Sequence, residues 1–183
     1  MSLPWTALLL SQLTWHWENQ LRPRLEGLTD AEFLWRPVED SWSIARAGES
    51  DAPMAVGSGE WLIDSAFPQP EPAPVTTIAW RVGHLLVGVL GARNASHFGA
   101  APASYEDDDD PGTADEALRR LDEAYATWCD GVRGLDGAAL AAPCGEGGFE
   151  QDPMAALVLH IHREVIHHGA EIALLRDLYL REG

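Results

Sequence analysis

Lysine is absent from this chain of 183 residues, so its twelve basic residues are all arginine. With 29 acidic residues, the formal net charge is −17. We expect no nucleic-acid or anionic-membrane partner, because an acidic surface repels the phosphates of both. The lack of lysine, together with a richness in alanine, glycine, arginine and aspartate, is typical of a high-GC bacterial genome.

Cysteine and long apolar runs are also scarce. Cys129 and Cys144 are the two cysteines, and they lack CxxC spacing. The sequence does not decide whether they form a disulfide. No apolar run reaches the ~20 residues that span a bilayer, and no N-terminal signal with a basic start and a small-residue cleavage site is present. We therefore expect a cytoplasmic protein with reduced thiols.

What the sequence does contain is apolar residues at intervals of three and four, which indicate amphipathic helices. A capping box at 113–116 and a proline at 153, suited to a first helical turn, mark two helix starts. The pattern predicts a short helix within 29–37 and long helices over 3–26, 76–98, 113–135 and 153–180. We expect one domain over 1–183 and an all-α fold, a four-helix bundle with long connections.

Two connections are unusual. Residues 38–75 are rich in glycine and proline and show at most a short hairpin within 40–65. We expect this segment to pack onto the domain through Trp42 and Trp61 and to set specificity. The acidic run 106–110 is expected to be a solvated loop, and binding of a cation or a protein partner there is the alternative.

The histidines are concentrated near the end of the chain, where four of the seven lie within nine residues. His160, Glu164 and His168 are spaced by four, so a helix places them on one stripe. Glu164 and His168 differ in direction by only about 40°, which brings both within reach of one cation. His84, on the predicted second helix, supplies a third ligand if that helix faces the last one. Three protein ligands leave one position open, as in catalytic zinc sites.

Other residues of this segment have more than one role open to them. His160 is an alternative ligand or lines the mouth of the site. Glu171 holds the second imidazole nitrogen of a ligand or, like His160, moves protons. His167 points about 100° away from His168, so the two are not expected to bind the same ion. The simpler alternative is a polar helix edge, whose side chains form surface ion pairs and hydrogen-bonded core groups.

Three segments of the chain resemble the DinB-like superfamily. They are Gly27-Leu-Thr-Asp-Ala-Glu-Phe-Leu-Trp-Arg-Pro37 followed by Ser41-Trp-Ser-Ile, His84 with Trp80 before it, and Arg163-Glu-Val-Ile-His-His-Gly-Ala-Glu171. The resemblance spans most of the chain in the expected order. It implies a four-helix bundle, frequently a homodimer, with a divalent metal held by one histidine of the second helix and an H-x3-H of the last.

In the register of that motif, the H-x3-H positions fall on Glu164 and His168, so glutamate replaces the first histidine. Mycothiol-dependent maleylpyruvate isomerases, a related branch, carry a glutamate in a run similar to R-E-V-x-x-H. The resemblance therefore implies His84, Glu164 and His168 as metal ligands, with His162 and His167 as bystanders. It implies zinc or nickel, with manganese or iron as alternatives because glutamate lowers the charge of the site.

The leading function that the resemblance implies is a metal-dependent transferase that uses a low-molecular-weight thiol, mycothiol, on a small-molecule substrate. The metal would bind the thiol as thiolate. A metal-dependent hydrolase, with Glu171 or His160 moving protons, is one alternative. A non-catalytic bundle or stress-related binding protein with a structural polar cluster is the other, so enzyme activity itself is left open.

Overall fold

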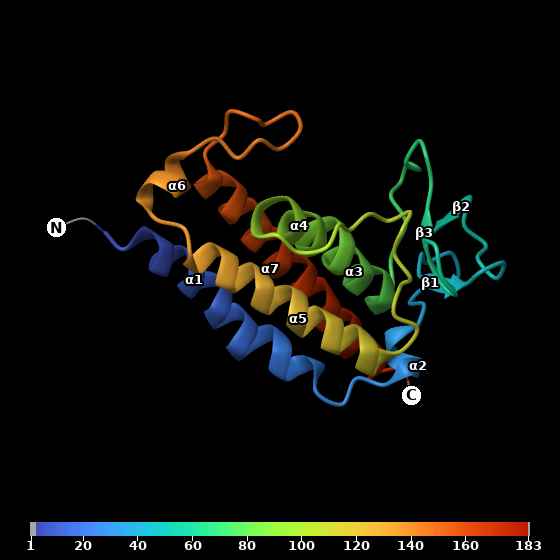
Figure 1. Cartoon of the computed structure of the whole chain (residues 1–183). Coiled ribbons are helices and arrows are strands. Elements are labelled where there is room, and N and C mark those ends of the chain that lie inside the picture. Colours follow the sequence, from blue (N-terminus) through green and yellow to red (C-terminus); the bar gives the residue numbers. More distant parts are fainter. Residues whose placement is uncertain (1–2, 183) are drawn as a thin grey trace.

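Four long helical stretches dominate the computed structural model, which describes residues 3–182 (Figure 1). They confirm the long predicted helices to within a few residues at each end. The stretches are α1 (Trp5–His16) continued by η1 (Trp17–Leu21) and η2 (Arg22–Leu25); α3 (Ile78–His84) continued by η3 (Leu85–Gly91) and α4 (Ala92–Phe98); α5 (Ala114–Arg133); and α7 (Met154–Tyr179). Within these stretches, η1 and η3 are π-helical and η2 is a 3₁₀ helix. Two short helices, α2 (Asp30–Phe33) and α6 (Gly137–Ala141), lie in the connections.

Threonine caps begin two of these stretches. Thr77 Oγ1 accepts a hydrogen bond from the Trp80 backbone N–H at 3.1 Å, and Thr113 Oγ1 accepts one from Glu116 at 3.4 Å. Each hydroxyl satisfies a backbone donor that the first turn of a helix leaves without an intrahelical partner. The first cap fixes the start of α3 and thereby the position of His84, its last residue.

The helical stretches share one apolar core. α7 packs against α1 and the α3–η3 stretch, and α5 packs against α1, α3 and η3. The inward side chains of these helices are buried, among them Leu13, Leu21, Leu85, Leu121, Val158 and Ile172. Burial of apolar area is the main favourable contribution to folding, and here it holds α3 and α7 next to each other (Figure 1).

A small antiparallel sheet corrects the expected all-α class. Its strands are β1 (Ile44–Arg46), β2 (Met54–Val56) and β3 (Trp61–Ser65), in the order β1-β3-β2. Ile44 lies opposite Ile63, and both belong to the buried core. The hairpin expected within 40–65 is therefore present, but strands of three to five residues offer too few alternating positions to reveal a whole sheet.

The acidic run 106–110 lies in a loop, as expected, but the expectation that this loop is solvated is only partly right. Arg120 Nη2 lies 2.8 Å from both carboxylate oxygens of Asp108, and the Trp61 backbone N–H donates to Asp109 at 3.0 Å. Asp110 is buried, and burial, with the neighbouring Asp108 charge, raises the pKa of its carboxyl to about 7. The loop between α4 and α5 is thus tied to α5 and β3.

The two cysteines are both buried and free, which answers the open disulfide question. Cys129 lies on α5, and Cys144 lies in the loop that precedes α7. Within residues 3–182, no helix combines the length and apolarity needed to cross a membrane.

Candidate metal centre

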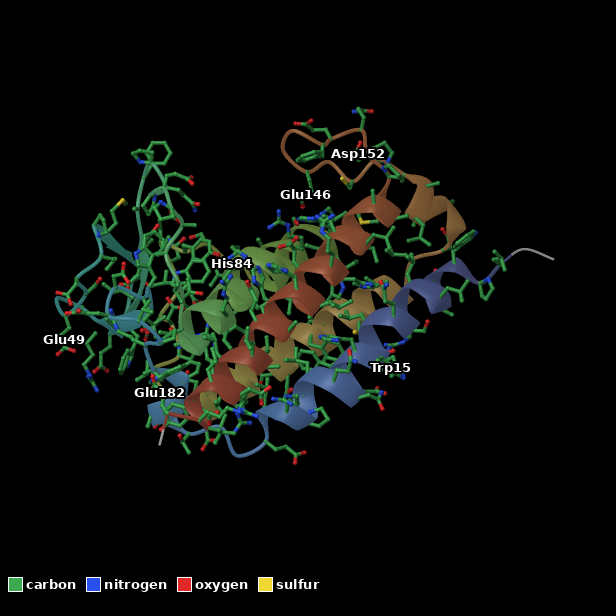
Figure 2. The ribbon with its side chains drawn as sticks, turned by 180° about the vertical axis from the view of Figure 1, so that it is seen from behind. Trp15, Glu49, His84, Glu146, Asp152 and Glu182 are labelled. Carbon is green, nitrogen blue, oxygen red and sulfur yellow. The ribbon has the colours of Figure 1, made fainter. Side chains whose placement is uncertain are left out.

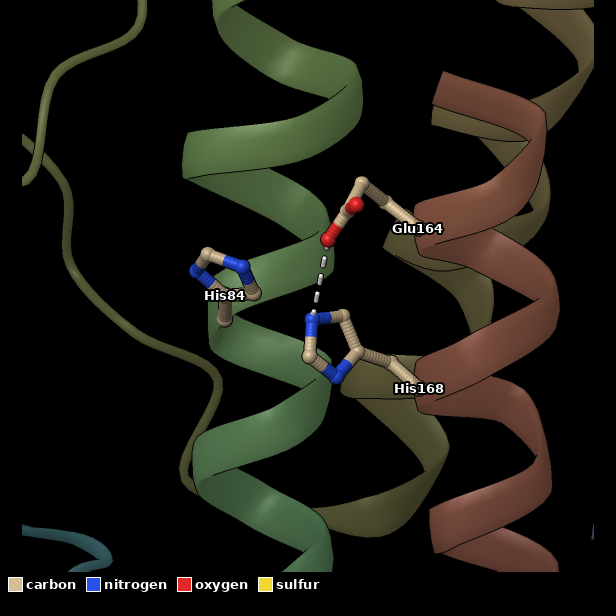
Figure 3. Close-up of side chains that lie close together, drawn as sticks. All are labelled: His84, Glu164 and His168. Carbon is tan, nitrogen blue, oxygen red and sulfur yellow. Dashed lines mark ion pairs between the residues drawn. The ribbon is translucent and has the colours of Figure 1, made fainter. Parts of the chain in front are cut away.

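The structure brings together the three residues that the sequence favours as metal ligands. His84 comes from the end of α3, and Glu164 and His168 come from successive turns of α7. One ligand atom from each of the three side chains lies within 4.8 Å of the others. Figure 3 shows the two imidazoles and the carboxylate facing the space between the two helices, and its dashed line joins His168 Nε2 to Glu164 Oε2 at 3.6 Å.

His84 is half-buried and has a neutral imidazole at pH 7. Its ring stacks on Trp80, with 5.4 Å between ring centroids, and its Nδ1 lies 2.6 Å from the Tyr105 hydroxyl. Burial lowers the pKa of His84 to about 4. The proximity of the His168 imidazole and of the Arg81 guanidinium lowers it further, and the Glu164 and Glu171 carboxylates oppose the shift. A neutral imidazole keeps a lone pair, which a metal ligand requires.

His168 is buried and tied to a carboxylate on its second nitrogen. Its Nδ1 lies 2.7 Å from Glu171 Oε2, and the same carboxylate oxygen lies 2.9 Å from Arg81 Nη1. Burial lowers the pKa of His168, although the hydrogen bond with Glu171 opposes that shift. An N–H at Nδ1 that donates to Glu171 leaves Nε2 with its lone pair, facing Glu164. Carboxylates commonly hold metal-ligating histidines in this way.

A second group of potential ligands overlaps the first. His167, His168 and Glu171 also each offer an atom within 4.8 Å of the others. However, the Arg81 guanidinium lies 2.9 Å from Glu171 and 3.3 Å from His168 Nδ1, so a positive charge already sits beside these groups. His167 is exposed and reaches Glu171 at 3.4 Å. The Glu171 carboxylate is thus already paired with the partly buried Arg81 at 2.9 Å, whereas the arginine beside Glu164 is the exposed Arg163 at 3.4 Å. Charge repulsion is therefore stronger in the second group, and the first group is the better candidate.

The remaining histidines of α7 lie outside both groups. His160 is partly exposed, contacts Arg163, and has its Nδ1 3.7 Å from Glu164 Oε1. His162 is fully buried and packs edge-on against Trp128. Burial lowers the pKa of His162 to about 4, against a smaller opposing effect of the Leu9 carbonyl. His162 is therefore a core residue, which agrees with the bystander expected from the sequence.

A cavity of about 390 Å³ lies next to the candidate metal centre, along the first half of α7. It is lined by His160, one turn before Glu164, and by Arg163, which directly precedes Glu164, and both pair with the Glu164 carboxylate. The loop before α7 covers it. That loop is anchored because Glu146 accepts hydrogen bonds from Arg93 at 3.1 Å and pairs with His97 at 2.9 Å. Figure 2 shows Glu146 and Asp152 on this loop, beyond His84 toward the start of α7. The other lining residues include Cys144, Phe149, Ala156 and Leu157.

The segment 38–75, which the sequence favours as the specificity element, lines a different cavity. This cavity measures about 560 Å³ and is lined by the segment after α2, the loop at 51–53, Asp64 of β3 and the proline-rich residues 70–75. The lining residues of both cavities lie outside the metal-ligand groups, but the smaller cavity, unlike this one, is lined by two residues that pair with Glu164, His160 and Arg163. The segment reaches the centre indirectly, through a hydrogen bond of 2.9 Å from Trp80 Nε1 to the Asp64 carbonyl.

Sequence reasoning missed two side chains that shape the centre. Arg81 could have been found, because it lies three residues before His84 and therefore on the same side of α3. Tyr105 carries no signal of this kind, since it lies in the loop between α4 and α5, and only the fold brings it to His84. The catalytic roles assigned to Glu171 and His160 stay predictions.

Comparison with known proteins matches the chain to one protein family. Residues 62–172, more than half of the chain, match the family model described as the DinB superfamily. The matched region contains His84, Glu164 and His168, the three residues of the first ligand group. No curated protein and no solved structure matches the chain.

Proposed function

The chain belongs to the DinB superfamily, and on that basis we propose that His84, Glu164 and His168 together bind one divalent metal ion. The observation that carries the proposal is the convergence of their ligand atoms, within 4.8 Å of one another, from two different helices. Members of this superfamily often bind divalent metals.

The chemistry of these side chains fits such an ion. Two imidazole nitrogens and one carboxylate suit zinc and also nickel, manganese or iron. We place zinc or nickel first. In both histidines Nδ1 already has a protein partner, Tyr105 for His84 and Glu171 for His168, so each ring can offer Nε2 to the ion. Three protein ligands leave room for a small molecule on the ion.

We propose that the protein transfers a low-molecular-weight thiol, with mycothiol as the thiol. A divalent cation held by the three ligands would lower the pKa of a bound thiol and so supply a thiolate nucleophile. The cavity of about 390 Å³ beside Glu164 offers space for the acceptor substrate. Phe149 and Leu157 give it apolar walls, and Arg163 gives it a positive charge at the end nearest the ligands.

Within this proposal, His160 is the better proton carrier and Glu171 is a positioning residue. His160 lines the cavity, is partly exposed, and lies 3.7 Å from Glu164, so it can exchange protons with both substrate and solvent. The Glu171 carboxylate is already paired with Arg81 at 2.9 Å and with His168 at 2.7 Å. Those contacts hold Glu171 on the far side of His168 from the other ligands.

The homodimer implied by the family resemblance is part of the same proposal. Several large apolar side chains are exposed on α1 and on the second half of α7: Trp5, Leu8, Trp15, Leu174 and Leu178. Exposed apolar area of this kind is typical of an interface between chains.

Turnover of electrophilic acceptor substrates tests the proposed activity. Metal-loaded wild-type protein should consume an acceptor in the presence of mycothiol and not in its absence. His168→Ala should abolish the reaction, because it removes a ligand, whereas His167→Ala removes an exposed imidazole and should retain it. Consumption without any thiol would instead identify a hydrolase. Protein that binds metal and turns over no acceptor with any low-molecular-weight thiol would contradict the transferase.

A further inference from the structure

The contact between Tyr105 and His84 joins two distant parts of the chain. The Tyr105 hydroxyl lies 2.6 Å from His84 Nδ1, a short distance for a hydrogen bond between oxygen and nitrogen. Tyr105 belongs to the loop between α4 and α5 and is partly buried there, packed against the core. Its ring is nearly parallel to that of His84, with 8° between the planes. The phenol is therefore placed to act on one nitrogen of the imidazole.

The other nitrogen of His84 points to the remaining ligands. In Figure 3 one ring nitrogen of His84 is turned toward Glu164 and the other is turned away from it. Because Nδ1 is the atom that contacts Tyr105, Nε2 is the atom on the ligand side. A neutral imidazole carries its single proton on one of the two nitrogens. A proton on Nδ1, donated to the Tyr105 oxygen, leaves the Nε2 lone pair free for a metal ion.

A glycine makes room for this contact. Gly88 lies one turn after His84, in the π-helical η3. A Cβ added at this position would overlap the Tyr105 hydroxyl and lie 3.2 Å from His84 Nδ1. Any larger residue at position 88 would thus push the phenol away from the imidazole.

The loop that carries Tyr105 is itself anchored. Arg120 of α5 holds Asp108 at 2.8 Å, and the backbone of Trp61 in β3 holds Asp109 at 3.0 Å. Ser58 adds a backbone hydrogen bond to the Asp108 carbonyl at 2.8 Å. These contacts fix the loop three to four residues beyond Tyr105, and they thereby restrain the position of the Tyr105 hydroxyl next to His84.

We propose that Tyr105 is a positioning residue of the metal centre. Its oxygen accepts a hydrogen bond from Nδ1–H of His84, which fixes the tautomer and the ring orientation that direct Nε2 toward Glu164 and His168. The acidic loop between α4 and α5 therefore serves the metal site, although none of its carboxylates belongs to the ligand group. This inference rests on the proposed function, since it concerns the same ligands.

Tyr105→Phe tests the inference because it removes only the hydroxyl. We expect the affinity for cobalt(II), added to metal-free protein, to fall about 10- to 100-fold, the usual loss when the partner of a metal-ligating histidine is removed. The visible absorption of the bound cobalt should shift as well. Tyr125→Phe is the control, because Tyr125 stacks on Trp17 at 3.9 Å and does not contact the ligands. Equal affinity and an unchanged spectrum in Tyr105→Phe would overturn the inference.

Nitrogen-15 NMR of the metal-free protein separates this inference from the proposed function. His84 should show the Nδ1-protonated tautomer in the wild type, and Tyr105→Phe should shift it toward the Nε2-protonated form. Wild-type protein that binds no cobalt would overturn the proposed function. An Nε2-protonated His84 in the metal-free wild type would overturn the role of Tyr105, whatever the outcome of cobalt binding.

Discussion

At the scale of single residues, His84 and His168 share one arrangement. Each has Nδ1 committed to a protein partner, a phenol for His84 and a carboxylate for His168. Burial lowers the pKa of both imidazoles, to about 4 for His84, which favours their neutral forms. With both Nδ1 protons donated to these partners, as we propose, two lone pairs face Glu164 before any ion binds, and preorganisation of this kind reduces the cost of binding.

Arg81→Gln is predicted to make metal binding more sensitive to acid. The Arg81 charge lowers the pKa of His168, whereas Glu171 raises it. Without the guanidinium the carboxylate acts alone, so the pKa of His168 rises and a proton competes with the metal at a higher pH. Isothermal titration with zinc between pH 7.5 and pH 6 checks this. Affinity should fall more steeply with decreasing pH in the variant, and parallel curves would show that Arg81 does not act through His168.

His162→Phe is predicted to reduce the loss of stability in acid. The pKa of His162 is about 4 in the folded protein and 6.5 in the unfolded chain. Between pH 4 and pH 6.5 the unfolded chain therefore binds a proton at this residue that the folded chain does not. Wild-type stability therefore falls as the pH falls from 6.5 to 4, by up to about 3 kcal/mol from this group. Any packing cost of the larger ring is independent of pH.

Urea denaturation at pH 7 and at pH 5 measures the effect of this substitution. The variant should gain stability relative to the wild type at the lower pH. In both proteins the free energy of unfolding still falls with pH to some extent, because the pKa of His84 is also about 4. A constant difference between the two proteins across this range would mean that His162 is not buried as a neutral group.

At the scale of elements, α7 is clamped at its end to the turn that follows the first helical stretch. Arg176 Nε lies 2.6 Å from Glu32 Oε1, and Nη1 donates to the Glu26 carbonyl at 3.0 Å. Both partners of the ion pair are buried, with side chains 12% and 3% exposed. These contacts tie the end of α7 to α2 and to the turn that follows η2.

Arg176→Met is predicted to destabilise the fold by about 3–5 kcal/mol, because it leaves the Glu32 carboxylate buried without its partner. Arg181→Met is the matched control at the same end of the chain. Its pair with Asp177 is exposed and 4.0 Å long, so its loss should cost less than about 1 kcal/mol. Urea unfolding of both variants gives the comparison. Similar losses in the two would rule out the clamp.

The long helices follow from the sequence because their apolar periodicity is sustained over many turns. The sheet does not, since β1 and β2 have three residues each and only one of these six residues, Ile44, is buried. The π-helical η3 has no sequence signal that we recognise, yet it provides the place where Gly88 meets Tyr105. For the candidate site, spacing on α7 and the family register predict the ligand trio. The i, i+3 spacing to His84 also marks Arg81, whereas the contact of Tyr105 with His84 follows from the tertiary structure alone.

At the scale of the whole molecule, the centre lies where three parts of the fold meet. α3 supplies His84, α7 supplies Glu164 and His168, and the loop between α4 and α5 supplies Tyr105, which the sheet and α5 hold in place. The candidate substrate cavity lies on one side of this point, under the loop before α7. We therefore expect metal binding to depend on residues that are far apart in the sequence, from His84 and Tyr105 to His168.

Metal analysis of protein purified without chelator or nickel resin shows whether His84, Glu164 and His168 bind an ion. We expect one divalent ion for each wild-type chain. His84→Ala and His168→Ala should lose the ion, because each removes one of three ligands, whereas His167→Ala should keep it, because that imidazole belongs to the group beside Arg81. A wild-type protein without stoichiometric metal, even after incubation with zinc or nickel, or equal occupancy in His168→Ala, would contradict the account.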